Sequence, residues 1–276
     1  MSDNNISIDV ENDNCVKLLQ ITDTHLFVDD DGSLLGVNTT ESFTAVVDAI
    51  IQGVTDFDAI LATGDISQDH TPESYHKFIQ GISPLKKPCF WLPGNHDYRP
   101  NMASVLPVPQ VKCIPHFMLG SHWQVVLLDS QVEGVPHGYL SAQQLSLLEE
   151  KLTAYPDKHT LILLHHHPVL VESAWLDQHT LKESESLWDV ISRFDNVKAI
   201  VCGHVHQDMD ILKQGVRVIA TPSTCVQFKP RSNEFALDLL SPGWRELNLL
   251  EDGSVETKIG RLDNGRFLPD FYAGGY

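Results

Sequence analysis

Short apolar runs alternate with stretches of helical periodicity along most of the chain. Runs such as TLILL have the length and composition of strands that are buried on both faces. Elsewhere apolar residues recur every three or four positions, which is the spacing of one helix face. The pattern predicts strands at residues 16–22, 58–63, 88–92, 123–129, 160–164 and 198–202, and helices beginning at residue 38, over 72–82, beginning at residue 141 and over 185–194.

Two of the predicted helices carry an N-terminal capping signal. Asn38 is followed three residues later by Glu41, and Ser141 is followed by Gln144. An Asn or Ser side chain at this position accepts a hydrogen bond from the first helical turn, so the two residues mark where helices begin. Beyond residue 208 the helical pattern fades, and residues 211–221 and 244–250 are predicted as strands.

The alternation of strands and helices predicts a layered α/β fold. The 276 residues are enough for one large domain, and a composition of 42% hydrophobic and 20% charged residues is typical of a globular protein. The sequence contains no repeat, low-complexity tract or convincing linker. We therefore expect a polar leader over residues 1–15 and a single domain over residues 16–276.

The charge of the chain restricts its partners and its location. The formal net charge is −18, which disfavours binding to nucleic acid or to an anionic membrane. The first residues lack the basic and apolar regions of a signal peptide, and no stretch approaches the roughly 20 apolar residues of a membrane span. We expect a cytoplasmic protein whose five cysteines, free of any C-x-x-C spacing, are reduced thiols and mostly buried.

Ligand-type side chains follow five of the predicted strands. In an open α/β sheet the loops at the carboxyl ends of strands line the ligand crevice, so these groups are expected to converge. Nitrogen and oxygen donors without thiolate favour iron, manganese or zinc. The groups are Asp23 with His25, Asp65 after Gly64, Asn95–His96–Asp97 after Gly94, the triple His165–His166–His167, and His204 with His206 after Gly203.

Each of these short motifs also has an ordinary structural explanation. Gly-Asp pairs and Asn-rich loops are common turn formers, because Asn and Asp bond their own backbone. His204 and His206 alone could be half-exposed strand residues. The order of all five motifs, each behind an apolar run, is what favours a metal site.

In that order, D-x-H, G-D, G-N-H-D, a histidine after a strand and G-H-x-H resemble the calcineurin-like metallophosphoesterases, from Val16 to His206. Within that superfamily, further stretches resemble the bacterial class III cyclic AMP phosphodiesterases of the CpdA type nearly from end to end. These stretches are GVNT, SQDH, WLPGNHD, LLDSQVEGVPHG, WLDQHTL and TPSTCVQFKP.

The resemblance implies a four-layer α/β/β/α sandwich with two metal ions, iron or manganese or both, at the strand ends. One metal would be held by Asp23, His25 and His206. The other would be held by Asn95, His204 and one histidine of the triple, and Asp65 would bridge the two. A hydroxide held between the metals would attack the phosphorus of 3′,5′-cyclic AMP and give 5′-AMP.

His96 and Asn95 would contact the substrate. His96 would stabilise charge on the phosphate or protonate the departing 3′ oxygen, and Asp97 would orient the His96 ring. The expected partner is therefore a small cyclic nucleotide, with no nucleic acid and no membrane, and the protein would be a monomer or a homodimer.

The histidine triple leaves the register of its ligand open. Alignment of strand ends favours His165, the first residue after TLILL, because the sheet holds it with the least loop ordering. Alignment by the distance to Pro168 gives His166 instead. We expect His167 to be a solvated loop residue.

Other functions remain as alternatives. Within the superfamily, the substrate could be a 2′,3′-cyclic nucleotide, a glycerophosphodiester or a phosphomonoester. A metal-stabilised protein that binds a nucleotide without hydrolysing it is a further alternative, although it has no need of His96.

Overall fold

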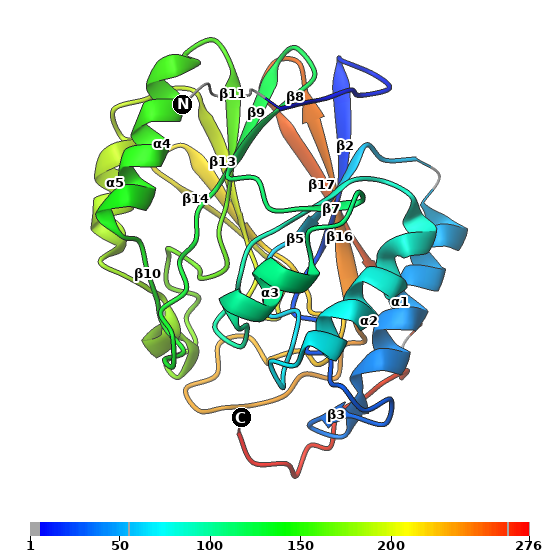
Figure 1. Cartoon of the computed structure of the whole chain (residues 1–276). Helices are drawn as coiled ribbons and strands as arrows, with labels where there is room; N and C mark the ends of the chain where they lie inside the picture. Colours follow the sequence, from blue (N-terminus) through cyan, green and yellow to red (C-terminus); the bar gives the residue numbers. More distant parts are fainter. Residues whose placement is uncertain (1–5, 55, 264, 276) are drawn as a thin grey trace.

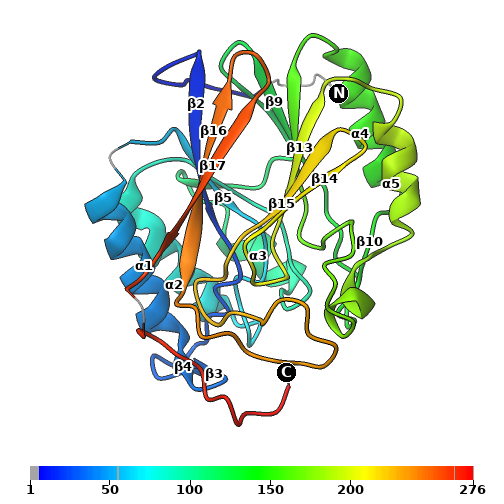
Figure 2. The ribbon, with the colours of Figure 1, turned by 180° about the vertical axis from the view of Figure 1, so that it is seen from behind.

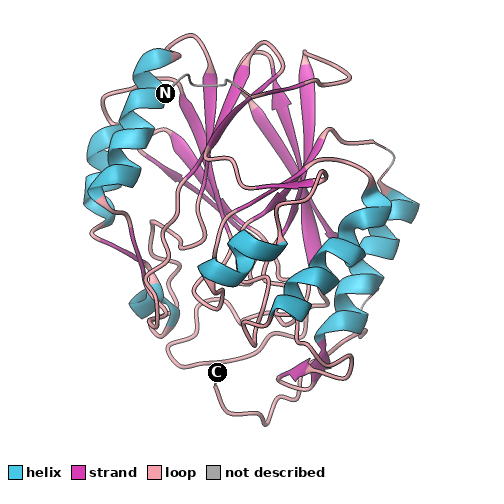
Figure 3. Cartoon of the chain, in the orientation of Figure 1, coloured by secondary structure: helices cyan, strands magenta, loops and turns pink. Residues whose placement is uncertain are grey.

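Two β-sheets pack face to face at the centre of the molecule, and helices cover their outer faces (Figure 1). The structure is a computed structural model that describes residues 6–54, 56–263 and 265–275. Figure 3 shows the same arrangement by secondary structure, with strands in the middle and helices on both sides. The four-layer α/β/β/α sandwich is therefore confirmed.

The first sheet has six strands, and its central strands are parallel. Helices α1 (Thr39–Gly53) and α2 (Pro72–Ile82) pack on its outer face, with the short α3 (Arg99–Val105) beside them. In spatial order the strands are β17 (Val255–Arg261), β16 (Gly243–Leu250), β2 (Cys15–Ile21), β5 (Ala59–Ala62), β6 (Cys89–Trp91) and β7 (Val111–Lys112).

The second sheet has seven strands, with β9, β11, β13 and β15 parallel to one another. Helices α4 (Ala142–Ala154) and α5 (Ser184–Ile191) cover its outer face (Figure 2). In spatial order the strands are β1 (Ser7–Ile8), β8 (His116–Leu119), β9 (Trp123–Leu127), β11 (His159–Leu163), β13 (Val197–Cys202), β15 (Val216–Ala220) and β14 (Met209–Lys213).

Smaller elements complete the chain and lie outside these sheets. They are the paired strands β3 (Ser33–Leu34) and β4 (Val37–Asn38), the paired strands β10 (Gly138–Tyr139) and β12 (Leu181–Lys182), and the 3₁₀ turns η1 (Ser83–Leu85) and η2 (Leu176–His179).

The central strands have apolar side chains on both faces, as the uninterrupted runs predicted. In β2, Val16 and Leu18 point into the layer between the sheets, whereas Leu19 and Ile21 point toward α1 and α2. Successive side chains of a strand alternate between its faces, so a strand covered on both sides must be apolar at nearly every position.

The predicted elements match the structure closely. The helix over 72–82 is confirmed, and each predicted strand up to residue 202 overlaps a central strand. Both caps are confirmed: the Asn38 side chain accepts from the Glu41 amide at 2.9 Å, and Ser141 accepts from Gln144 at 3.4 Å. The last predicted helix ends at Ile191, three residues before its predicted end at residue 194.

Several features beyond these elements bear on the earlier expectations. Ser7 and Ile8, within the segment predicted as a polar leader, form β1 and pair with β8. The cysteines in the described ranges are free, and three of them are buried, as expected. Over the described parts of the chain, no helix has both the length and the apolar character that crossing a membrane would require.

Candidate metal centre

The ligand-type residues predicted from the sequence lie together where strands of both sheets end. Asp23 and His25 follow β2, Asp65 follows β5, His165 follows β11, and His204 and His206 follow β13. These six side chains are buried, with exposed fractions from 0% to 6%, while Asn95 after β6 is half-buried. Buried polar groups at this density are costly unless they are satisfied by partners or by a ligand.

One cluster gathers Asp23, His25 and His206. Their ligand-capable atoms all lie within 4.8 Å of one another. The Nε2 atoms of His25 and His206 are 3.2 Å apart, and His206 Nε2 is 3.4 Å from Asp23 Oδ1. Three lone-pair donors thus converge on one point.

A second cluster is centred on His165. Its Nε2 atom lies 3.1 Å from Asn95 Oδ1 and 3.2 Å from Asp65 Oδ2. The same Asp65 oxygen is 3.9 Å from His25 Nε2, so this carboxylate stands between the two clusters. His204 joins His165 and His166 in a further group whose ligand atoms lie within 4.8 Å of one another.

The other nitrogen of three of these rings is held by an outer partner. A hydrogen bond at Nδ1 fixes the orientation of the ring and directs Nε2 toward the centre, an arrangement common around metal-binding histidines. The pairs are His25 Nδ1 with Gln68 Oε1 at 2.7 Å, His165 Nδ1 with the Thr63 carbonyl at 2.7 Å, and His206 Nδ1 with the Val226 carbonyl at 2.9 Å.

The three histidines of the triple have different surroundings. His166 Nδ1 bonds the Ser130 hydroxyl at 2.8 Å, and its Nε2 has no hydrogen-bond partner among the described residues. The expectation that His167 is solvated is wrong, because its side chain is fully buried. The Leu181 amide donates to the His167 carbonyl at 3.1 Å, which brings the segment around η2 close to this residue.

The backbone at the ligand positions is unusual. Glycine, or an Asn, Asp or His side chain, is the usual occupant of the left-handed region. Such a backbone turns sharply at the strand end and brings successive side chains toward one point. The residues with positive φ are Asp23 (54°), His25 (47°), Asp65 (49°), His204 (68°) and His206 (49°).

Gly94 is required for a different reason, namely close packing. A Cβ atom at this position would lie 2.1 Å from Asp65 Oδ1 and 2.4 Å from the Asp65 amide nitrogen. Only glycine therefore lets the loop after β6 approach Asp65.

His96 and Asp97 lie beside the two clusters. The His96 amide donates to Asp65 Oδ1 at 2.8 Å, and the His96 ring contacts the His25 ring edge-on at a centroid distance of 5.2 Å. The Asp97 carboxylate accepts from the backbone amides of Ile66, Ser67 and Gly94. These bonds tie the loops after β5 and β6 together; the role of Asp97 in orienting His96 stays a prediction.

The charge states of His25 and His204 suit metal ligands, whereas the pKa of His165 is raised. Burial lowers the pKa of His25 to about 3 and holds the pKa values of His166 and His204 well below their usual range. Neutral imidazoles keep a lone pair for a metal. Burial also lowers the pKa of His165, but the Asp65 carboxylate more than offsets this and raises that pKa to about 9.

Residues that the sequence analysis did not single out support the site. Gln131 donates to the carbonyls of Gly94 and Asp97 at 2.6 and 2.5 Å and so holds the G-N-H-D loop. Arg99 forms a two-point ion pair with Asp129 nearby. The available signal was the stretch LLDSQVEGVPHG, which contains both Asp129 and Gln131.

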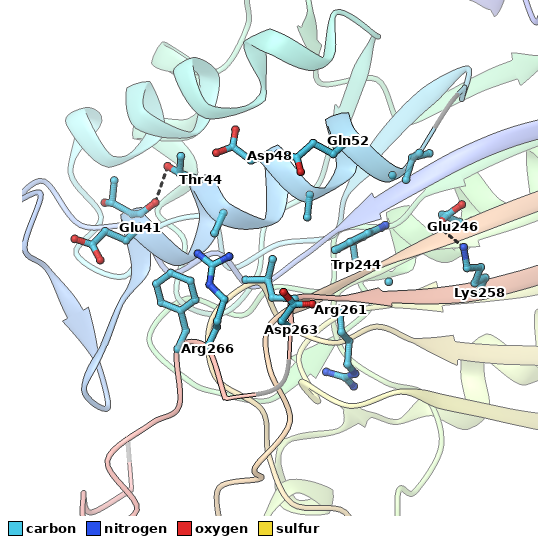
Figure 4. A pocket seen from close by; sticks show the side chains of 18 residues that line it. Glu41, Thr44, Asp48, Gln52, Trp244, Glu246, Lys258, Arg261, Asp263 and Arg266 are labelled. Atoms are coloured by element: carbon cyan, nitrogen blue, oxygen red, sulfur yellow. Dashed lines mark hydrogen bonds and ion pairs between the residues drawn. The ribbon is translucent and has the colours of Figure 1, made fainter.

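A separate groove of about 840 Å³ lies between α1 and the outer faces of β16 and β17 (Figure 4). Its lining includes Trp244, Arg261 and Arg266, with Glu246 and Lys258 paired at 3.5 Å. None of the ligand-type residues described above lines it. The groove is therefore separate from the candidate metal centre.

The residues present fit a pair of metal ions. The donors are imidazole nitrogens, carboxylate oxygens and one amide oxygen, a set that suits iron, manganese or zinc. The buried Nε2 atom of His204 has no hydrogen-bond partner within the described ranges, as expected for a ring that faces a metal-binding cavity.

This fold and this ligand set define a class of protein. The family model for calcineurin-like phosphoesterases matches residues 16–208, and the chain belongs to that family. The family uses a dinuclear metal centre, for which the described residues contain suitable His and Asp groups.

Among relatives, the chain is 62% identical over 270 residues, 98% of both chains, to "3′,5′-cyclic adenosine monophosphate phosphodiesterase CpdA" of Vibrio vulnificus. It is 50% identical to the protein of the same name from Escherichia coli K12, over 95% of both chains. Among solved structures, a dimetal phosphatase from Danio rerio has a TM-score of 0.64 at 15% identity, covering 89% of this chain and 98% of that one.

Proposed function

We propose that this chain hydrolyses 3′,5′-cyclic AMP to 5′-AMP at a dinuclear metal centre. The observation that carries the proposal is the position of Asp65, a buried carboxylate within 3.9 Å of histidine nitrogens from both clusters. The family supports a metal-dependent hydrolase, and the names of the relatives support the substrate.

The geometry of the two clusters supports the proposed ligands. Asp23, His25 and His206 would hold one metal ion. Asn95, His165 and His204 would hold the other, with Asp65 shared between them. We choose His165 over His166 because its Nε2 lies 3.2 Å from Asp65 Oδ2 and 3.1 Å from Asn95 Oδ1. The Nε2 atom of His166, which is buried and has no hydrogen-bond partner among the described residues, has neither contact. Iron or manganese, or both, are the proposed metals.

Bound divalent metals would supply two effects, a lowered pKa for an attacking water and neutralisation of charge on the phosphate. Side chains of the protein would position the substrate and supply the proton for the leaving group. His96 is half-buried at the edge of the clusters, and the hydrogen bond from its backbone N–H to Asp65 fixes the position of its backbone. A protonated His96 ring would donate to the phosphate and transfer its proton to the 3′ oxygen as the oxygen of the attacking water bonds to phosphorus and the P–O3′ bond breaks, which leaves 5′-AMP and a neutral His96 ring.

Further proposals concern the setting of the reaction. We propose a single catalytic domain over residues 16–276 and a cytoplasmic protein that acts as a monomer or homodimer. A net charge of −18 supports a small singly charged substrate over nucleic acid or a membrane, because a polyanion would be repelled by the whole surface.

One purified sample tests this function. Elemental analysis should find two metal ions per chain, and hydrolysis should be measured on 3′,5′-cyclic AMP, 2′,3′-cyclic AMP, a glycerophosphodiester and an aryl phosphomonoester. We expect 3′,5′-cyclic AMP to be preferred, strong chelation to abolish turnover, and Mn²⁺ or Fe²⁺ to restore it. Full activity in protein shown to be metal-free would contradict the proposal, as would nucleotide binding without turnover in the metal-loaded protein.

A further inference from the structure

A polar layer crosses the otherwise apolar space between the two sheets, directly behind the candidate metal centre. Val16 and Leu18 of β2 point into the apolar inter-sheet core, and Gln20 follows them on the same face of the strand. Gln20 is fully buried. A buried amide is expensive unless all its hydrogen bonds are made.

Gln20 bonds to strands of both sheets. Its Nε2 donates to Thr63 Oγ1, next to β5 in its own sheet, at 2.8 Å, and to the Cys202 carbonyl of β13 in the opposite sheet at 3.0 Å. Its Oε1 accepts from the Thr221 hydroxyl, which follows β15 in the opposite sheet. One side chain thus connects three strand ends across the sandwich.

Arg245 of β16 continues this layer away from the centre. Its guanidinium donates to Thr221 Oγ1 at 3.0 Å, to the Ala220 carbonyl at 2.7 Å and to Thr257 Oγ1 at 2.7 Å. It is 2% exposed, and its charge is paired with Asp208 at 2.6 Å. We call Gln20, Thr63, Thr221 and Arg245 the inter-sheet bridge.

The inner end of the inter-sheet bridge adjoins proposed ligands from both sheets. The Thr63 carbonyl accepts from His165 Nδ1, and Thr63 itself is two residues before Asp65. Cys202 is two residues before His204, and the Gly203 amide between them donates to the His165 carbonyl at 3.1 Å. Displacement of the Gln20 amide would therefore move ligands of both sheets.

We propose that the inter-sheet bridge is a positioning device that sets the distance between the metal ligands contributed by one sheet and those contributed by the other; this rests on the proposed function. Each cluster takes ligands from both sheets. The layer between the sheets is mainly apolar beyond the bridge, and other hydrogen bonds between the sheets, such as Trp123 Nε1 to the Leu250 carbonyl and the His204 amide to Asp23, lie at its two ends. Apolar contacts are non-directional and leave sliding of one sheet over the other weakly restrained. Hydrogen bonds are directional, and a functional site must be held to within about 0.5 Å.

Two variants remove the inner end of the inter-sheet bridge, and two serve as controls. Gln20→Met and Thr63→Val remove hydrogen-bonding groups with little change in volume. Thr63→Ser keeps the hydroxyl and should therefore keep the metal binding that Thr63→Val loses. Thr257→Val deletes one hydrogen bond of the same Arg245 at the outer end, away from the ligands.

Mn²⁺ affinity of each protein, measured by competition with a chelator, is the main readout. We expect Gln20→Met and Thr63→Val to bind the pair of ions 10- to 100-fold more weakly, a range typical of partners that orient metal ligands. The EPR signal of the coupled Mn²⁺ pair should change in the same two variants. Thr63→Ser and Thr257→Val should keep both properties, whatever their melting temperatures.

The outcomes distinguish a failure of the proposed function from a failure of the positioning role. Parent protein that takes up no metal refutes both the proposed function and the positioning role. If the parent protein binds two ions but Gln20→Met and Thr63→Val have the same Mn²⁺ affinity and EPR signal as Thr257→Val, the positioning role alone is refuted. If Gln20→Met does not fold, the contrast between Thr63→Val and Thr63→Ser decides the question.

Discussion

Replacement of each histidine of the triple by alanine, one at a time, should distinguish the metal ligand from its two neighbours. In His165→Ala the metal centre loses the nitrogen that lies 3.2 Å from Asp65 and 3.1 Å from Asn95. His166→Ala removes a ring whose Nδ1 bonds Ser130, and His167→Ala removes a buried ring outside the proposed ligand set.

The expected magnitude follows from the number of ligands. The second metal would have four protein ligands, namely Asp65, Asn95, His165 and His204. Four-ligand sites for Zn²⁺ bind with about 10–16 kcal/mol, so one ligand contributes roughly 2.5–4 kcal/mol. At about 1.4 kcal/mol for each factor of ten, His165→Ala should weaken this site by about 10²–10³-fold.

Metal content after dialysis, measured by elemental analysis, together with thermal unfolding, distinguishes the three variants. His165→Ala should retain one ion per chain, while the other two variants should retain two. His167→Ala should still unfold more easily, because removal of a buried ring leaves a cavity that costs about 2 kcal/mol or more. Loss of metal in His166→Ala alone would refute the proposed register.

Three further predictions concern His96, Gly94 and Asn38. His96→Ala should lower kcat on cyclic AMP by roughly 10²–10⁴-fold with metal content unchanged, and an activated aryl phosphodiester should recover much of the loss; parental rates on both substrates would remove His96 from the mechanism. Gly94→Ala should lose metal in elemental analysis, since its Cβ would lie 2.1 Å from Asp65 Oδ1. Gly53→Ala is the control and should keep its metal, since a Cβ at Gly53 would meet no atom of the described residues within 4 Å beyond its chain neighbours and its own helix backbone. Asn38→Ala should lower the free energy of unfolding by about 1 kcal/mol in denaturant titrations and leave kcat unaltered, because it removes a helix cap and an exposed hydrogen bond to the Asp30 carbonyl; a change in kcat would contradict this.

The central strands could be predicted because burial on both faces makes them apolar at nearly every position. Elements at the edges lacked this signal. Strand β17 is mostly half-exposed, so its sequence VETKIGR carries little apolar pattern. Helix α3 has seven residues and a single buried side chain, Met102, which is too little for a helical period to show.

The candidate ligands could be found because they are polar residues directly behind strands. The pairing of each ligand with its supporting partner could not be predicted, although Gln68 lies in the quoted stretch SQDH, because the partners are distant in sequence: Gln68 lies 43 residues from His25, and Thr63 lies 102 residues from His165. The burial of His167 was missed for the same reason, because it depends on Leu181 and the segment before it folding back over the loop.

The left-handed backbone at Asp23, His25, Asp65, His204 and His206 has a consequence for the history of the chain. A residue other than glycine in a sparsely populated backbone region costs roughly 1–3 kcal/mol, although Asn, Asp and His tolerate the left-handed region better than most. Glycine would relieve this strain at each position. Under the proposed ligand roles, a lineage released from metal binding would relieve this backbone strain by drifting to glycine at these positions.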